Sequence, residues 1–199
     1  MSLDLVPISE LDAVNEMLTS IGGSPLSSLE DITELEDATI ARQLLHNISR
    51  ELQSEGWHFN TEPEENLVPD IVDGDIDLPG NTLGCDTTGT SCALNVTIRG
   101  TKLYDLENHT FDFSAYTSGI EVELIVFLEW TDLPEYARRY IYIRAGRKFQ
   151  KKMLASTELE SMTEEDEIRA FANFKNRESQ NADHNILTNT QVQAAWFRI

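Results

Sequence analysis

The chain has 199 residues, and its 35 Asp and Glu against 15 Lys and Arg give a formal net charge of −20. A hydrophobic content of 40% is that of a folded protein, and the length allows one sizeable core or a core with a smaller lobe. Non-specific DNA binding needs many phosphate-neutralising Lys and Arg, so the charge excludes a general DNA-binding surface, although solubility alone explains the carboxylates equally well.

Two helices are predicted within residues 1–60. Ser9 is a good N-cap with Asp12 three residues later, which predicts a capping box, and Gly22-Gly23 ends this helix. A second helix follows an acidic loop and stops at Gly56. Its apolar face consists of Ala41, Leu44, Leu45, Ile48 and Leu52.

Residues 61–130 are predicted to form a β module. Helical periodicity disappears there, and Pro and Gly separate short runs of β-forming residues. Trp57 and Phe59, just before the module, share one side of an extended segment and are assigned to the core. Arg99-Gly100-Thr101-Lys102 has the composition of a hairpin turn. The predicted strands are Asn81–Asp86, Leu94–Arg99, Lys102–Asp105, Thr110–Phe113 and Ile120–Glu129.

Two further helices are predicted after the β module. The third starts at Asp132, whose side chain is expected to cap it while Glu135 completes a capping box. The fourth runs from about Glu158 to Asn181, and the acidic residues Glu164–Glu167 in its first turns suit the positive end of a helix dipole.

The predicted fold class is α+β: an α-helical bundle formed from both ends of the chain with an inserted antiparallel β domain. The expected divisions are 1–60 and 131–181 for the two parts of the helical domain, 61–130 for the β-rich insertion, and 182–199 for a C-terminal docking tail. The tail ends in Trp196-Phe197, and so apolar a terminus either packs on its own core or docks on another subunit.

Basic residues are concentrated in the third helix. No acidic residue lies between Glu135 and Glu158, and the rest of the chain has eight basic residues against 35 acidic ones. This helix either pairs with Glu158–Glu167 on the next helix or meets an acidic partner surface or DNA phosphates. Together with Trp196 and Phe197, its seven basic residues are the predicted assembly interface: Arg138, Arg139, Arg144, Arg147, Lys148, Lys151 and Lys152.

No catalytic residue, metal or cofactor is predicted. The four histidines lack metal-ligand spacing. The segment containing Asp73, Asp75 and Asp77 resembles the start of a calcium loop, but Leu78 and Gly84 occupy the positions of the required Gly and Glu. With 35 carboxylates, some pair will lie at glycosidase distance by chance, so such a pair indicates little.

The chain is expected to be a soluble protein made in the cytoplasm. Asp4 and Glu10 stand where a signal peptide would be basic and apolar, and the longest apolar run, Leu124–Leu128, is too short to cross a bilayer. Cys85 and Cys92 are close enough in sequence to close a small loop through a disulfide, but without a secretory signal their thiols are expected to be free, as is usual in a reducing compartment.

Several motifs in register, over about residues 10 to 180, resemble the tail tubular protein A family. This family comprises the adaptor proteins (head-to-tail connectors or gatekeepers) of short-tailed bacteriophages, the podoviruses. The motifs near the N-terminus are Leu11-Asp12-Ala13-Val14-Asn15, Ile21-Gly22-Gly23-Ser24-Pro25 and Gly56-Trp57-His58-Phe59-Asn60. Those further on are Leu78-Pro79-Gly80-Asn81-Thr82-Leu83, Arg99-Gly100-Thr101-Lys102-Leu103-Tyr104-Asp105, Asp132-Leu133-Pro134-Glu135, Arg139-Tyr140-Ile141, Arg144-Ala145 and Arg147-Lys148-Phe149-Gln150.

The resemblance implies a virion protein of the tail or neck, without catalysis, that forms a ring of twelve copies beneath the capsid portal. Its implied partners are the portal protein, the tail nozzle (tubular protein B) and the tail fibre. Viral DNA would pass through the lumen without specific binding during packaging and ejection, and the phage itself would be made in the host bacterial cytoplasm. We expect the basic helix to lie at subunit or portal contacts, the alternative being a ring of basic side chains that touches DNA.

Two other functions are compatible with the composition. One is a tail-associated glycan hydrolase that acts on host surface polysaccharide through an Asp/Glu pair, and a reducing-sugar assay tests it. The other is an acidic decoy that binds basic host proteins by mimicking phosphates, which predicts salt-sensitive binding.

Overall fold

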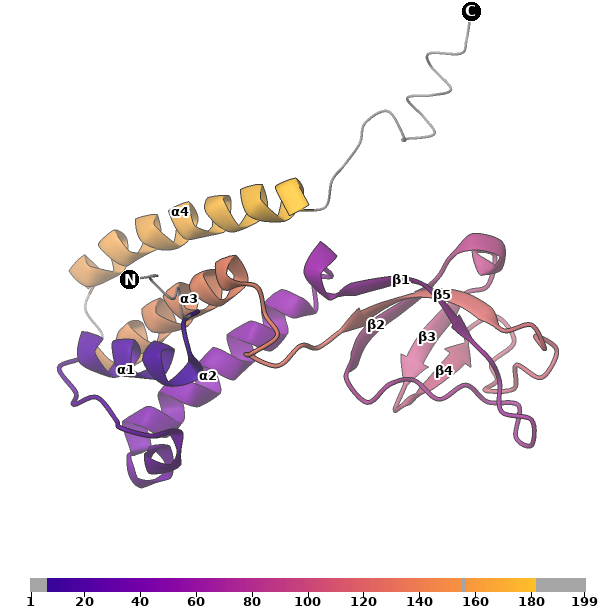
Figure 1. The fold of residues 1–199 in the computed structure, drawn as a ribbon, viewed down its shortest axis with the longest axis horizontal. Coiled ribbons are helices and arrows are strands. Elements are labelled where there is room, and N and C mark those ends of the chain that lie inside the picture. The colour runs from indigo at the N-terminus through magenta and orange to yellow at the C-terminus, as the bar shows by residue number, and fades with distance from the viewer. Residues whose placement is uncertain (1–6, 155–156, 182–199) are drawn as a thin grey trace, which may run out of the picture.

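The computed structural model describes residues 7–154 and 157–181, and the predicted tail with Trp196 and Phe197 lies outside this range. Four helices form one body and five strands form the other (Figure 1). The chain enters the helical body, crosses to the β body and returns, and the predicted α+β class is confirmed. The helices are α1 (Glu10–Ser20), α2 (Glu36–Gln53), α3 (Glu135–Leu154) and α4 (Thr157–Asn181).

The predicted start of α1 is confirmed. The backbone N–H of Asp12 donates to Ser9 Oγ, and the backbone N–H of Ser9 donates to an Asp12 carboxylate oxygen, which completes the capping box. After α1, Gly22 takes φ +82°, a backbone region that glycine occupies without strain. A 3₁₀ turn, η1 (Leu29–Glu34), then leads into α2.

The start of α3 corrects the sequence prediction. Asp132 does not begin the helix, because Pro134 keeps the residue before it out of the helical conformation. The first helical bonds instead run from the N–H groups of Ala137 and Arg138 to the Pro134 carbonyl. Glu135 does not close a capping box either, since its carboxylate accepts from the backbone N–H of Ile8, 3.1 Å away.

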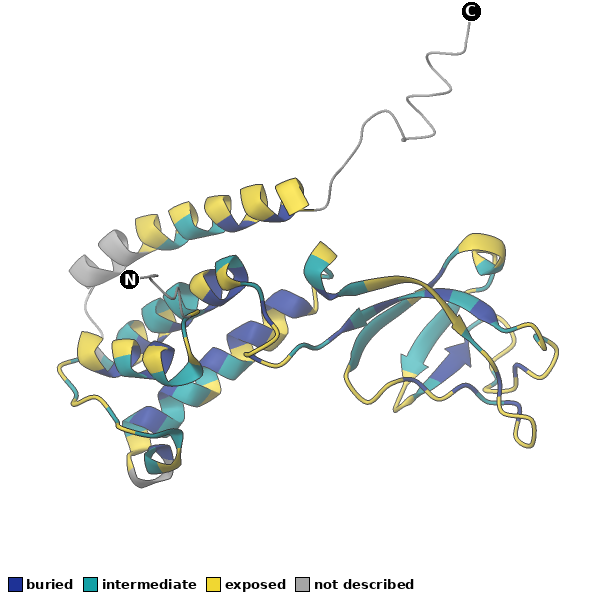
Figure 2. Cartoon of the chain, viewed as in Figure 1, coloured by how far each residue is buried: buried dark blue, intermediate teal, exposed yellow. Residues whose placement is uncertain are grey.

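The core of the helical body surrounds α3, which packs against α1, α2 and α4. The buried sides of the helices face one another, while the outer sides are exposed (Figure 2). Phe174 of α4 is buried between the rings of Trp57 and Tyr140, whose centroids lie 4.6 and 5.5 Å away. Trp57 and Phe59 do pack on this core, but His58–Asn60 is a 3₁₀ turn (η2) and not the expected extended segment.

The β body contains an antiparallel sheet with the order β1-β5-β2 and a separate hairpin, β3–β4. Arg99 and Lys102 pair across the hairpin turn, as predicted. The segment 110–113 is not a strand: Thr110 makes one isolated bridge to Asp105, and Phe113 turns into the core. The strands are β1 (Thr61–Leu67), β2 (Thr82–Thr87), β3 (Val96–Arg99), β4 (Lys102–Asp105) and β5 (Ile120–Val126).

The edge strand β1 was not predicted. Its sequence, TEPEENL, is acidic and contains Pro63, and it lacks the alternation of a half-buried strand. Its pairing with β5 shifts register between Glu62 and Glu65, where Glu64 takes φ +60°. Such a bulge and such charges are typical of an edge that does not pair with another chain.

Buried amides join the two bodies. Gln53, at the end of α2, donates to the Leu128 carbonyl (3.0 Å) and accepts from the Leu128 N–H (2.7 Å). Asn60 donates to the carbonyls of Gln53 and Val126, both at 2.9 Å. Both side chains are essentially inaccessible to solvent, so breaking these bonds would leave polar groups without water to replace them. We call these two residues the junction amides.

Candidate assembly interface

The structure places the predicted basic residues along α3 in three different environments. Arg138 is buried, with 9% of the residue exposed. Its guanidinium donates to the backbone carbonyls of Leu133 (2.8 Å) and Thr131 (2.7 Å), and also to that of Ile8. Arg138 therefore fastens the start of α3 to the N-terminal segment, and this geometry gives no support to its predicted contact with a partner.

A second group of basic residues is paired within the chain. Arg144 and Arg147 of α3 both contact Glu167 of α4, and the Arg147–Glu167 distance is 2.6 Å. Arg144 and Lys148 also contact Glu51 of α2, at 2.6 and 3.3 Å. The expected pairing with the next helix thus describes Arg144 and Arg147, whereas Lys148 pairs with α2, which was not predicted.

The third group is exposed. Arg139, Lys151 and Lys152 face solvent, as does the paired Lys148 of the second group. Within the part of the chain that the structure describes, Arg139 and Lys152 form no ion pair. Of the seven predicted basic residues, these two are therefore the best placed to meet an acidic partner.

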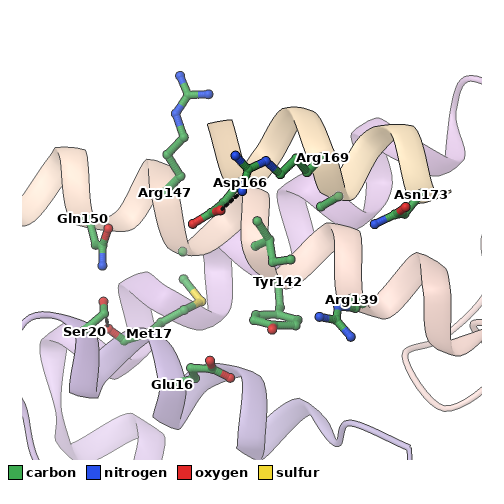
Figure 3. A pocket seen from close by; sticks show the side chains of 13 residues that line it. Glu16, Met17, Ser20, Arg139, Tyr142, Arg147, Gln150, Asp166, Arg169 and Asn173 are labelled. Atoms are coloured by element: carbon green, nitrogen blue, oxygen red, sulfur yellow. Dashed lines mark hydrogen bonds and ion pairs between the residues drawn. The ribbon is translucent and has the colours of Figure 1, made fainter. Parts of the chain in front are cut away.

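Arg139 lines a groove between α1 and α4 whose floor is α3 (Figure 3). The groove has a volume of about 500 Å³. Its apolar lining comes from Met17 of α1, from Tyr142 and Ile143 of α3, and from Ala170 of α4. The charged lining consists of three arginines and two carboxylates: Arg139, Arg147, Arg169, Glu16 and Asp166. We call this surface the α1–α4 groove.

The loop between β1 and β2 carries a surface that the sequence analysis missed. Ile71 is 99% exposed and Val72 is 87% exposed, although both are aliphatic and adjacent. We call these two residues the apolar tip. The signal available in the sequence was an aliphatic pair enclosed by turn residues, Pro69-Asp70 before it and Asp73-Gly74 after it.

The acidic segment that resembles a calcium loop is occupied by a lysine. Lys102 of β4 forms an ion pair with Asp75 and lies 3.9 Å from Asp77. The hydrogen bond from Lys102 to Asp75 raises the pKa of the lysine, so the ammonium stays charged. Across residues 7–154 and 157–181, no group of three or more Asp, Glu, His or Cys side chains is arranged to hold a metal ion.

The carboxyl groups with shifted pKa values do not resemble a glycosidase acid. Hydrogen bonds from His46 and Arg42 lower the pKa of Glu10 to about 2. Backbone donors lower the pKa of Asp70, and hydrogen bonds also lower those of Asp105 and Asp112. A general acid for glycoside hydrolysis needs a raised pKa, so none of these four has the required chemistry.

The two cysteines are free thiols, as expected. Burial raises the pKa of Cys85 to about 11, which keeps it protonated and unreactive, while Cys92 is exposed.

The comparisons identify the kind of protein that carries these surfaces. Residues 11–184 match the model of the tail tubular protein family, and the chain therefore belongs to this family. It is a structural component of a bacteriophage tail and is located in the virion. No curated protein matches the chain. None of the described helices combines the length and apolarity needed to span a membrane.

Proposed function

We propose that the protein is the adaptor of a short-tailed phage: a ring of twelve copies that joins the capsid portal to the tail nozzle and offers attachment points for tail fibres. The observation that carries this proposal is the family match over residues 11–184, which covers both bodies. Viral DNA would cross the lumen of the ring during packaging and ejection without specific binding. Assembly would follow synthesis in the host cytoplasm.

The charge arrangement supports a channel that does not retain DNA. Arg144, Arg147 and Lys148, three of the seven basic residues of α3, pair with Glu51 and Glu167, which makes their charges less available to phosphates. The chain as a whole has a formal charge of −20. A lumen lined by such a surface repels the DNA backbone, which favours fast passage.

The proposed division of labour follows the two bodies. We assign residues 1–60 and 131–181 to the helical domain and residues 61–130 to the β domain, with 182–199 as a docking tail. The exposed basic residues Arg139, Lys151 and Lys152 and the tail residues Trp196 and Phe197 are the proposed contacts with neighbouring subunits or the portal.

Electron microscopy of the protein mixed with purified portal rings tests this function. The expected result is a second ring stacked on the portal, absent when either component is imaged alone. An Arg139→Glu variant should stack less well, while Arg50→Glu, a change on α2 away from the groove, serves as a charge-matched control. Portal rings without added density at low and moderate salt would refute the adaptor function.

A further inference from the structure

The apolar tip is an unusual surface for a charged protein. Ile71 and Val72 belong to the loop that follows β1, and this loop reaches the end of the β body away from the helices (Figure 1). Val68, in the same loop, is 61% exposed. Exposing adjacent aliphatic side chains gains nothing for folding, whereas burying them against a partner is favourable.

The loop holds the tip in one conformation. The Asp70 carboxylate accepts from the backbone N–H groups of Val72 (2.7 Å) and Asp73 (3.2 Å). The Asp70 N–H donates to the Asp75 carbonyl at 2.7 Å. Gly74 closes the turn at φ +72°, with its carbonyl accepting from the Phe113 N–H at 2.7 Å. A tip that is ordered before binding loses little conformational entropy when it docks.

The α1–α4 groove has the complementary features. It offers Met17 of α1 and Tyr142 and Ile143 of α3 to an aliphatic side chain. Arg139 of α3 also lines it and forms no ion pair with any residue that the structure describes (Figure 3). The tip is apolar between two carboxylates, Asp70 and Asp73, and backbone hydrogen bonds to Asp70 lower its pKa and keep it ionised. The groove combines an apolar lining with the Arg139 guanidinium, which is unpaired among the described residues, and Glu16 and Asp166 also line it.

We propose that the apolar tip of one copy seats in the α1–α4 groove of the next copy in the tail, with Asp73 facing Arg139. The loop that carries the tip belongs to the β body, whereas α1, α3 and α4, which line the groove, belong to the helical body at the other end of the molecule, so tip and groove do not meet within one chain (Figure 1). Every copy carries both halves, which makes the contact heterologous and able to close a ring. This inference deepens the proposed function, because it names the contact through which copies join.

Cysteine cross-linking in assembled tail particles tests the contact directly. The variant chains carry Cys92→Ser and are the only source of the protein in phage-infected cells. We expect Ile71→Cys combined with Ile143→Cys to give disulfide-linked dimers and higher multimers on mild oxidation, because a disulfide forms only when two Cβ atoms lie about 4 Å apart. Ile71→Cys combined with Ile168→Cys is the matched control, since Ile168 is an exposed residue of α4 outside the groove. The proposal would be overturned if both cysteine pairs gave equal amounts of multimers, or if the groove pair, Ile71→Cys with Ile143→Cys, gave none.

A charge exchange gives an independent measurement that does not require a disulfide. Asp73→Arg and Arg139→Asp should each lower incorporation into tails by about tenfold, and the double variant should restore it. If the double variant is incorporated into tails no better than the single variants, the contact is contradicted. Electron-microscopy images of wild-type tail particles test the proposed function separately. If they show the adaptor ring but the groove-pair variant does not cross-link, only the tip contact is refuted. If the groove-pair variant cross-links but the copies lie elsewhere in the tail, only the adaptor position is refuted.

Discussion

The helical body and the β body are stabilised to different degrees. Eighteen buried residues form the core of the helical body, against eight in the β body, so the second has much less apolar area to offset its loss of chain entropy. The helical body also contains the ion pairs between α3 and its neighbours. The β body instead relies on its attachment through the junction amides, and it carries the most exposed aliphatic residues. The helical body therefore supplies most of the apolar stabilisation, and the β body presents the exposed aliphatic surface of the apolar tip.

Core truncations should give the largest effects and show whether the bodies unfold separately. Phe174→Ala and Phe113→Ala each empty a site that is 1% exposed and should each cost about 3–5 kcal/mol. Hydrogen exchange should report faster opening of α4 in the first variant and of β5 in the second. Ile168→Ala, a change at an exposed position, should stay within about 0.5 kcal/mol. Identical exchange in both bodies for either core variant would show that they unfold as one unit.

Removing a junction amide should have the next largest effect. Gln53→Leu leaves the N–H and carbonyl of Leu128, which are partly buried, without the Gln53 amide as their partner and should lower the free energy of unfolding by about 2–3 kcal/mol. Denaturant unfolding measures the loss. Gln43→Leu, a change at an exposed position on the same helix, is the control, and an equal loss in both variants would rule out the junction as the cause.

The Glu10 ion pairs predict a pH-dependent contribution. The pKa of Glu10 falls from 4.5 to about 2 on folding, so the stabilisation is fully present above pH 4.5 and is lost as the pH falls toward 2. Glu10→Gln should therefore cost about 1–2 kcal/mol at pH 7, and the difference from wild type should shrink through that range. Unfolding measured at pH 7, 5 and 3 checks this, with exposed Glu62→Gln as control. A difference that does not change with pH would exclude the carboxylate charge as its source.

The smallest expected effect is a gain. Gly146 lies inside α3, and an added Cβ would approach Met17 Cγ at 3.9 Å, which is ordinary contact. Gly146→Ala should therefore stabilise the helical body by about 0.5–1 kcal/mol. Gly56→Ala should instead destabilise, since φ is +72° and the new Cβ would fall 2.7 Å from Ile125 Cδ1. The midpoint temperatures of thermal unfolding should shift in opposite directions for the two variants. Shifts in the same direction would show that local geometry does not decide the effect.

The sequence predicted the helices better than the sheet, for physical reasons. Helix signals such as the Ser9 capping box and the apolar periodicity of α2 are local, so they can be read from short windows. Strand β1 lacks a local signal, because its conformation depends on pairing with β5, which lies more than fifty residues away. The resemblance found by motif order agrees with the family match over residues 11–184.

The candidate interface could be predicted only in part from the sequence. Composition located the basic helix, and pairing with Glu158–Glu167 was one of the two expectations, which the Arg147–Glu167 ion pair fits. The contacts of Arg144 and Lys148 with Glu51, and of Arg138 with Ile8, depend instead on segments that are distant in sequence. The α1–α4 groove likewise needs three helices from separate parts of the chain. The sequence contains the two adjacent aliphatic residues of the apolar tip, but it does not show that they are exposed. Their exposure results from the turn formed by Asp70 and Gly74.

The junction amides have a geometrical consequence for any closed assembly of identical copies. In such an assembly the angle between the two bodies helps to set the rotation from each copy to the next. A small error in this angle is therefore repeated at every copy, and the last copy then fails to meet the first. Gln53 and Asn60 reduce that error by tying α2, η2 and the end of β5 together through buried bonds. The two amide side chains thus limit how far the angle between the bodies can vary from one copy to the next.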